Sequence, residues 1–305
     1  MKLFEDTHPQ TPSAATIGFF DGVHLGHRFL IKQVKEAASQ AGLCSSIITF
    51  PIHPRQVIQS DYQPQLLSSP EEKINLLATT GIDQCILLPF TKELSRLTAR
   101  EFMQLLHDEY QVRMLVIGYD HRFGHNRTDN FEDYCRYGKE LGISILRANA
   151  YTQAADKVSS SAVRRALLNG EIETASQYLG YPYSMEGTVV DGYKVGRKIG
   201  FPTANLQLVH THKLIPAEGV YAVYAQIEDK QWKGMLNIGH RPTLNNGPNL
   251  SIEVHILDFN EDIYQKKIRI EFVHFLRPEV RFQSTDELIE QMQKDKEATL
   301  RRLSI

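Results

Sequence analysis

The stretch Gly18-Phe19-Phe20-Asp21-Gly22-Val23-His24-Leu25-Gly26-His27 decides how the first half of the chain folds. It ends the apolar run 14–20, and apolar residues then recur at helical spacing up to Gly42, so the pattern predicts a strand, a tight turn and a helix. The free N–H groups and positive dipole end of a helix start attract anions. His24 and His27, one turn apart, add imidazole donors, and Gly26 lets a phosphate approach closely. The corner therefore predicts a nucleotide phosphate site; the alternative is an ordinary exposed helix start.

Length and composition favour a two-domain globular protein. The chain has 305 residues, of which 42% are hydrophobic and 23% charged, and no apolar run is long enough to span a bilayer. Residues 1–13 lack a secretion-signal pattern, so we expect a cytoplasmic protein without a membrane partner. Cys44, Cys85 and Cys135 are too few and too far apart to indicate disulfides or a zinc site. The formal net charge of −2 gives no overall drive toward nucleic acid, and none is expected as a partner.

In the first half, apolar runs alternate with amphipathic segments. Strands are predicted at 14–20, 46–50, 84–88, 113–117 and 144–146, and helices at 71–80, 99–110 and 130–141. Strands separated by helices indicate an α/β fold with a parallel sheet covered on both faces. Ligands of such a sheet bind beyond the carboxyl ends of the strands, where His24 and His27 fall. The proline-rich loop 51–70 is long enough to suggest a functional role.

The second half has the pattern of antiparallel strands. Runs rich in β-branched and aromatic residues lie at 220–227, 232–238, 251–259 and 267–275, and residues 228–230 suit a hairpin turn. These strands suggest a small barrel or sandwich. Ser284 and Glu287 form a candidate capping box for a C-terminal helix. We place the domain boundary between residues 183 and 184.

Three further segments carry candidate site residues. Ser160 and Ser161 cap a predicted helix start with Arg164 one turn later, and together with the two histidines they could grip a triphosphate from both sides. The alternative is a plain cap with a solvated arginine.

Gly192, Gly196 and Gly200 stand at four-residue spacing beside Lys194 and Arg197, which permits a loop whose amides face phosphates. A flexible surface loop would have the same composition. The Pro-Thr-Ala-Asn segment that follows favours the phosphate-binding loop over the surface loop. The Thr203 hydroxyl and the Asn205 carboxamide would project to one side of an extended chain, where both could bind Mg²⁺.

Alternation along residues 251–256 places Glu253 and His255 on one face of a strand. Such a face is commonly solvated. If it faces a phosphate site instead, Glu253 is a candidate base for a substrate hydroxyl.

In this order, the motifs resemble those of bacterial bifunctional riboflavin kinase/FMN adenylyltransferases (FAD synthetases), over nearly the whole chain. The first half carries the motifs at 18–27, 49–54 (Thr-Phe-x-x-His-Pro), 118–124 (Gly-Tyr-Asp-His-Arg-Phe-Gly) and 159–164. The second half carries the glycine series through 202–205, the Asn-Ile-Gly-x-Arg-Pro-Thr motif at 237–243 and the Glu253 strand. The resemblance implies a Rossmann-like nucleotidyltransferase domain at 1–183 and a riboflavin kinase barrel with a C-terminal helix at 184–305.

The resemblance implies two reactions. ATP phosphorylates riboflavin to FMN, with Mg²⁺ held by Thr203 and Asn205 and with Glu253 as the base. FMN then attacks the α-phosphorus of a second ATP, giving FAD and pyrophosphate, and His24, His27 and Arg164 stabilise charge. Residues assigned to ATP or its phosphates are Gly18, Phe19, Asp21, Gly22, Gly26, Ser160, Ser161, Gly192, Lys194, Gly196, Arg197 and Gly200. Residues assigned to flavin are Asp120, Phe123, Asn237 and Arg241.

Three positions depart from the usual family pattern, namely His121 for an aromatic residue, Ser161 for threonine and Gln265 for glycine. His121 could change how the adenylyltransferase half holds the flavin, and so its preference among flavins. The main alternative is a nucleotidyltransferase for another phosphorylated substrate with a regulatory flavin-binding barrel. A flavin-storage module and a class I aminoacyl-tRNA synthetase fit the residues less well. Whether the chain forms a homo-oligomer is left open.

Overall fold

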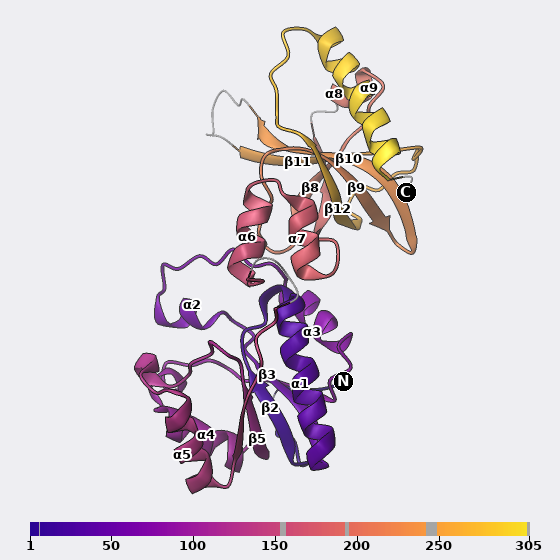
Figure 1. Ribbon diagram of the computed structural model, residues 1–305. Coiled ribbons are helices and arrows are strands. Elements are labelled where there is room, and N and C mark those ends of the chain that lie inside the picture. The colour runs from indigo at the N-terminus through magenta and orange to yellow at the C-terminus, as the bar shows by residue number, and fades with distance from the viewer. Residues whose placement is uncertain (6, 153–156, 193–194, 242–248, 304–305) are drawn as a thin grey trace. The chain divides into compact units, whose positions relative to one another are not determined.

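The computed structural model describes residues 1–5, 7–152, 157–192, 195–241 and 249–303. Its contacts divide into two compact units, Met1–Ser160 and Ser161–Ile305, which are described separately (Figure 1). Among the described residues, no helix combines the length and the apolar character that crossing a membrane requires.

The first unit is built on a six-stranded parallel sheet with the strand order β1-β4-β3-β2-β5-β6. Its strands are β1 (Lys2–Phe4), β2 (Ser13–Ile17), β3 (Cys44–Thr49), β4 (Gln84–Leu87), β5 (Val112–Ile117) and β6 (Ser144–Arg147). Its helices are η1 (Asp21–Val23), α1 (Leu25–Ala41), α2 (Pro54–Ile58), α3 (Pro70–Ala78), η2 (Leu94–Arg96), α4 (Ala99–Asp108), η3 (His125–Arg127) and α5 (Phe131–Leu141). The chain leaves β2 toward β3 on one side and returns to β5 on the other, so the strand order reverses at β2. Parallel sheets bind ligands at such a reversal.

Two hydrophobic clusters cover the two faces of this sheet. One joins the sheet to α1 and α3 through residues such as Val34 and Leu77, and the other joins it to α4 and α5 through Met103 and Tyr134. Figure 1 shows these helix pairs on opposite sides of the sheet. Capping boxes begin α3, α4 and α5, which explains why the sequence pattern located these helices well.

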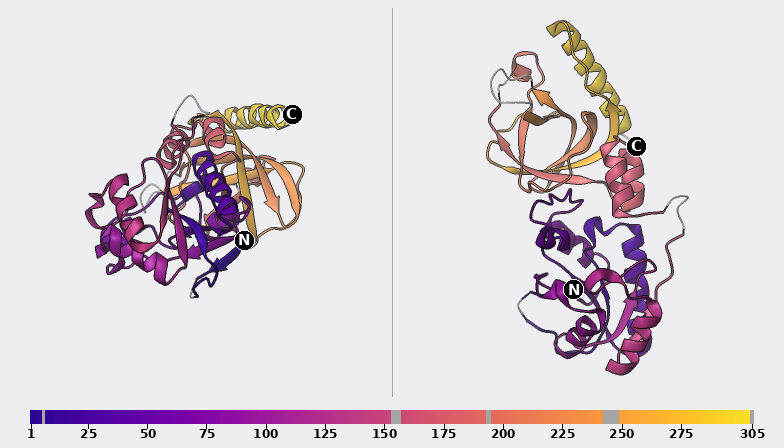
Figure 2. Two further views of the ribbon diagram at one scale, coloured as in Figure 1. Left: turned by 60° about the horizontal axis from the view of Figure 1, so that its bottom comes forward. Right: turned by 90° about the vertical axis from the view of Figure 1, so that its left-hand side faces the viewer.

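The second unit is a closed antiparallel barrel with the order β10-β11-β8-β7-β12-β9, seen in the right-hand view of Figure 2. Its elements are α6 (Ser160–Leu168), α7 (Ile172–Leu179), β7 (Ser184–Val190), α8 (Val195–Lys198), β8 (Ala204–Leu208), β9 (Gly219–Ile227), β10 (Lys230–Arg241), β11 (Asn249–Ile256), β12 (Lys267–Arg277) and α9 (Thr285–Arg302). Closure leaves no edge strand open to another chain. Helix α9 packs against β9, β10 and β12.

The predicted fold class is confirmed: a parallel α/β sheet is followed by an antiparallel barrel with a C-terminal helix. Ile227 pairs with Lys230, so the predicted hairpin turn is present. The pattern did not predict β1, β7 or β8 as strands, and loop 51–70 contains the short helix α2.

The contact-based division falls at residues 160 and 161, whereas the sequence analysis placed the domain boundary at 183 and 184. The difference is the pair α6 and α7, of which α7 packs against β12. The assignment of residues 1–183 and 184–305 to separate activities stays a prediction.

Candidate functional site

The corner after β2 has a strained backbone that its surroundings hold in place. Phe20 and Val23 have φ angles of 55° and 36°, which are unfavourable for residues with a side chain and especially for a β-branched one. The buried Asp21 carboxylate accepts hydrogen bonds from the backbone N–H groups of Leu67 (2.9 Å) and Ser68 (3.1 Å). Asp21 therefore ties the end of loop 51–70 to the corner, and its assignment to phosphate stays a prediction.

His24 begins α1 as its N-cap. Its Nδ1 accepts the N–H of His27 at 3.3 Å, so the proton of the neutral ring lies on Nε2. The two imidazoles stack with centroids 3.6 Å apart. A Cβ on Gly26 would lie 3.1 Å from the His24 ring, so a larger residue here would press on the imidazole. The predicted close approach of a phosphate to Gly26 is a separate expectation that stays untested.

The imidazoles of His27 and His121 are neutral near pH 7. Burial, reinforced by His24 and His121, holds the pKa of His27 well below its usual value. Burial, reinforced by Arg127, lowers the pKa of His121 to about 4. His27 Nδ1 and His121 Nε2 are both buried, and neither has a hydrogen-bond partner within the part of the chain that the structure describes. Histidines at a protein surface have pKa values near 6.5 and are partly protonated just below pH 7. The buried imidazoles of His27 and His121 stay uncharged in that range, because burial lowers their pKa values.

Ser160 lies against the same turn, because its hydroxyl donates to the Asp21 carbonyl at 3.0 Å. Gly18 donates its N–H to the Ile48 carbonyl at 3.0 Å, which joins the ends of β2 and β3. Ser161 and Arg164 belong to the second unit. The predicted grip of histidines and arginine on one triphosphate stays a prediction.

A polar cavity of about 430 Å³ opens at the carboxyl ends of β5 and β6. Asp120 and His121 line it, together with Arg122 and Arg147, and Asp120 forms an ion pair with Lys157. Phe123 instead lies in the core, 7% exposed and stacked on Tyr134 with centroids 4.4 Å apart. Its role in packing is clear, whereas the flavin contact assigned to it stays a prediction.

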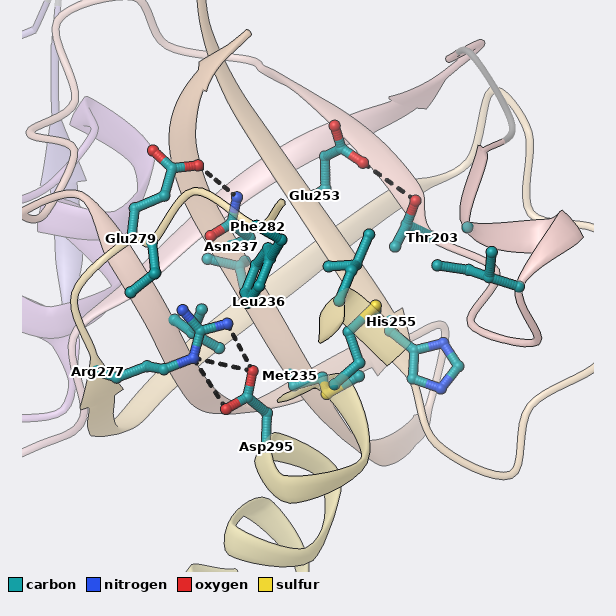
Figure 3. A pocket seen from close by; sticks show the side chains of 16 residues that line it. Thr203, Met235, Leu236, Asn237, Glu253, His255, Arg277, Glu279, Phe282 and Asp295 are labelled. Atoms are coloured by element: carbon teal, nitrogen blue, oxygen red, sulfur yellow. Dashed lines mark hydrogen bonds and ion pairs between the residues drawn. The ribbon is translucent and has the colours of Figure 1, made fainter. Parts of the chain in front are cut away.

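In the barrel, one cavity of about 320 Å³ is lined by several of the residues singled out from the sequence (Figure 3), namely Gly196, Thr203, Asn237, Glu253 and His255. Glu253 Oε2 accepts a hydrogen bond from the Thr203 hydroxyl at 3.1 Å. In the strand register Glu253 stands opposite Asn205 on β8 and opposite Asn237 on β10. Residues that pair across antiparallel strands share a face, so these side chains converge. The face with Glu253 lines a cavity, and the alternative of a merely solvated strand face is wrong.

His255 lies on this face as well. It is 9% exposed, its Nδ1 lies 2.7 Å from the Pro202 carbonyl oxygen, and burial is the main cause that lowers its pKa. The ring thus holds the segment just before Thr203 and stays neutral near pH 7.

The glycine series is packed tightly against its own chain. A Cβ on Gly192 would lie 2.0 Å from the Asn205 side chain, and one on Gly196 would lie 2.2 Å from the Phe201 carbonyl oxygen. Gly200 has φ of 87° with open space around its Cβ position. Arg197 is exposed on α8, and Lys194 lies outside the described residues. Two of the three glycines thus have packing reasons, and phosphate binding by this loop stays a prediction.

Comparisons with known proteins agree with this geometry. A family model described as FAD synthetase matches residues 6–162, and one described as riboflavin kinase matches residues 179–303. The bifunctional riboflavin kinase/FMN adenylyltransferase of Listeria monocytogenes is 39% identical, covering 98% of this chain and 97% of that protein. The chain belongs to this family. The protein of the same name from Escherichia coli is 36% identical, with coverage of 97% and 96%.

A solved structure extends the fold match over the whole chain. It is described as a macrolide-efflux protein from Streptococcus pneumoniae, is 30% identical, and has a TM-score of 0.87 over 98% of this chain and 99% of that one. The resemblance inferred from motif order is therefore confirmed at the level of the family and the fold.

Sequence reasoning missed several residues around the barrel cavity of this family member. Glu279 accepts a hydrogen bond from Asn237 at 3.3 Å and fills the space above Gly239. Arg277 forms a two-pronged ion pair with Asp295 of α9, with nitrogen to oxygen distances of 2.8 and 3.0 Å. The sequence contains one sign of the Arg277–Asp295 pair. Asp295 lies on the same helical face as the apolar residues 288 and 292, where a carboxylate is unexpected without a partner.

The remaining predicted residues lie as follows. The Phe19 ring meets the His53 ring edge to face with centroids 4.7 Å apart. Arg241 ends β10 with its backbone paired to Asn249, and its side chain lies outside the described part. The N–H of Gly22 donates to the Ser68 hydroxyl at 3.1 Å.

Proposed function

We propose that the barrel cavity phosphorylates riboflavin with ATP, and that the corner at residues 18–27 adenylylates the resulting FMN. The first assignment rests on one observation: Thr203, Asn205, Asn237 and Glu253 converge on one face of the barrel beside an apolar wall. Riboflavin and FMN occur in the names of the relatives, and FAD occurs in the description of the matching family model. ATP is the co-substrate of both reactions.

The two sides of the cavity suit the two ends of riboflavin. Phe282 and the α9 residues Leu288 and Met292 offer an apolar surface to the flat ring system. Asn237 and Glu253 offer polar groups to the hydroxylated chain. This orientation brings the terminal hydroxyl to the carboxylate.

Glu253 acts as the base for phosphoryl transfer. Its carboxylate takes the proton of the 5′-hydroxyl, the hydroxyl oxygen bonds to the γ-phosphorus, and the bond from that phosphorus to ADP breaks. The Thr203 hydroxyl, 3.1 Å away, orients the carboxylate. Positioning and charge stabilisation supply most of the rate.

The donor set beside Glu253 fits Mg²⁺. Thr203 and Asn205 contribute a hydroxyl and a carboxamide oxygen, hard ligands of the kind this cation prefers, next to a carboxylate. When bound with ATP, Mg²⁺ neutralises phosphate charge. The assignment of these two residues as its ligands is part of the proposal.

FMN adenylylation needs no base, because the FMN phosphate is already an anion. One of its oxygens bonds to the α-phosphorus of ATP as the bond from that phosphorus to pyrophosphate breaks. His24 and His27 stabilise the charge that develops on the phosphates through hydrogen bonds. Arg164, in the second unit, is assigned to the departing pyrophosphate.

The proposal is tested by incubating the purified chain with ATP and Mg²⁺, starting from riboflavin in one series and from FMN in another. Chromatography separates riboflavin, FMN and FAD. FAD from both starting flavins is the expected result. No phosphorylation and no FAD from either flavin, in a folded protein, would overturn the proposal in favour of a nucleotidyltransferase for another phosphorylated substrate.

A further inference from the structure

A buried lysine packs against the corner at residues 18–27. Lys73 of α3 is 3% exposed, and its Nζ donates to the Phe50 carbonyl oxygen at 2.7 Å. The same ammonium lies 4.0 Å from the centroid of the Phe19 ring. Among the described residues it makes no hydrogen bond to a carboxylate. Burying an ammonium in this way is unfavourable, so a reason for a lysine here is needed.

The two residues that Lys73 contacts lie just beyond the carboxyl ends of two neighbouring central strands. Phe19 comes just after β2 and Phe50 just after β3, at the edge of the sheet where ligands bind. The Thr49 hydroxyl also donates to the Phe19 carbonyl at 3.1 Å, and the Phe19 ring meets His53. One ammonium thus holds the segments after both strands in a fixed relation.

We propose that Lys73 is a positioning residue for FMN adenylylation, whose protonated ammonium fixes Phe19 and Phe50 and thereby the corner that carries His24 and His27. This inference rests on the proposed function of the corner. An apolar side chain of similar length could fill the same volume. It would leave the Phe50 carbonyl without its donor and the Phe19 ring without its cation, so the corner could shift.

The charged and titratable groups around Lys73 determine when it is protonated. Burial is the main cause that lowers its pKa, to about 8, and the negative charge of Asp21 of η1 opposes this lowering. Burial raises the pKa of the Cys85 thiol of β4 to about 12, so this thiol stays neutral and adds no charge beside Lys73 near pH 7. On its own helix, Glu71 and Glu72 bond to Ser69 at the N-cap. The ammonium is therefore charged near pH 7 and loses its proton in mild alkali.

The test measures kcat and KM for FMN adenylylation between about pH 7 and about pH 9 in the full chain, with Lys73→Met and Lys73→Arg. The wild type is expected to lose adenylylation kcat as the pH rises through about 8, while riboflavin phosphorylation in the same protein shows no such loss. Lys73→Met is expected to lower adenylylation kcat at pH 7 by between about tenfold and a hundredfold, without that alkaline decline. Lys73→Arg, charged throughout, is expected to keep part of the activity and to abolish the decline.

Lys35 provides a matched control in the same unit. Its Nζ also donates to a backbone carbonyl, that of Thr80 at 2.8 Å, but away from the corner. Lys35→Met should keep both the adenylylation kcat and its alkaline decline.

Two outcomes would overturn the role of Lys73. One is a Lys73→Met protein with normal kinase activity and a wild-type adenylylation profile. The other is equal loss in Met and Arg variants while the wild type shows no alkaline decline, which indicates packing alone. Failure of the wild type to make any FAD would instead contradict the proposed function itself.

Discussion

At the residue scale, the two proposed reactions depend on different side chains. Glu253 lies in the barrel with Thr203 at 3.1 Å, whereas His24 and His27 lie at the corner of the parallel sheet. No residue is assigned to both chemistries. Single substitutions should therefore separate the two activities.

Glu253→Gln should lower riboflavin phosphorylation by about 10² to 10⁴-fold, because the carboxamide cannot take the hydroxyl proton. FAD formation from supplied FMN should remain at the wild-type rate. Chromatography of flavins from both starting substrates checks this. A folded variant that loses both activities would contradict independent sites.

His27→Ala should have the reverse effect. Removing one donor that stabilises developing charge should lower FMN adenylylation by roughly 10² to 10³-fold, with riboflavin phosphorylation unchanged. His107→Ala is the control, because His107 lies on α4 and bonds to its neighbour Asp108. If His27→Ala forms FAD from FMN as fast as this control does, the assignment of His27 is wrong.

The neutral histidines predict acid sensitivity. The folded protein holds the pKa of His121 at about 4, while the unfolded chain has the ordinary 6.5. Below pH 6.5 the unfolded state takes up protons first, so stability present at pH 7 is lost as the pH falls toward about 4. By about 1.36 kcal/mol per pKa unit, His121 contributes at most about 3 kcal/mol to this loss.

Denaturant unfolding at pH 7 and about pH 5 measures this effect, with His121→Phe as the comparison. The variant should lose clearly less stability than the wild type over that interval, because Phe does not titrate. An equal loss in both proteins would show that other groups cause the acid sensitivity.

At the scale of elements, an ion pair between Arg277 and Asp295 fastens helix α9 to the barrel. Asp295, whose side chain is 7% exposed, holds Arg277 at the end of β12, and on the same helix Leu288 and Met292 reach the cavity. The pair thus connects a structural contact to one wall of the proposed flavin site.

Asp295→Ala should destabilise the barrel by about 3 kcal/mol, because Arg277 would stay largely buried without a partner. It should also raise KM for riboflavin while leaving FMN adenylylation unchanged. Lys294→Ala is the matched control, since it breaks only an exposed pair with Glu290 on the same helix. Unfolding curves and kinase kinetics compare the two. Equal KM values for riboflavin in both variants would contradict a role of α9 in the cavity wall.

The elements differ in how far their sequences predict them. Helices with local caps, such as α3 and α5, were predicted within a few residues, because all their signals lie within one segment. Strand β7 was missed, since its Gly187 weakens the local pattern. That glycine serves close packing on β8, where a Cβ would lie 3.1 Å from Leu206.

At the scale of the whole molecule, two units with separate folds are joined in one chain. Because no residue is assigned to both reactions, the intermediate FMN need not be made and used by the same molecule. A mixture of Glu253→Gln and His27→Ala proteins should therefore form FAD from riboflavin, whereas neither forms it efficiently alone.

Chromatography over time checks the mixture, and added FMN shows that the Glu253→Gln partner is competent. A mixture that accumulates FMN without FAD, despite that competence, would contradict exchange of free FMN between molecules. The mixture should show a lag before FAD appears, because FMN must first accumulate in solution.

The two fold classes, the order of the motifs and most of the capped helices could be predicted from the amino-acid sequence. Each of these depends on residues within one short segment, through period, turn chemistry and spacing. The resemblance to the family also predicted that Thr203 and Glu253 belong to one site.

The contacts of each side chain, in contrast, follow from how the elements pack. Asp21 bonds to residues 46 and 47 positions later, Lys73 reaches back to Phe50 and Phe19, and Arg277 meets Asp295. Such pairings depend on strand order, register and closure of the barrel, and no local pattern encodes them. The pKa values of His27 and Lys73 follow from the same cause, since both are set by burial that exists only once the elements pack.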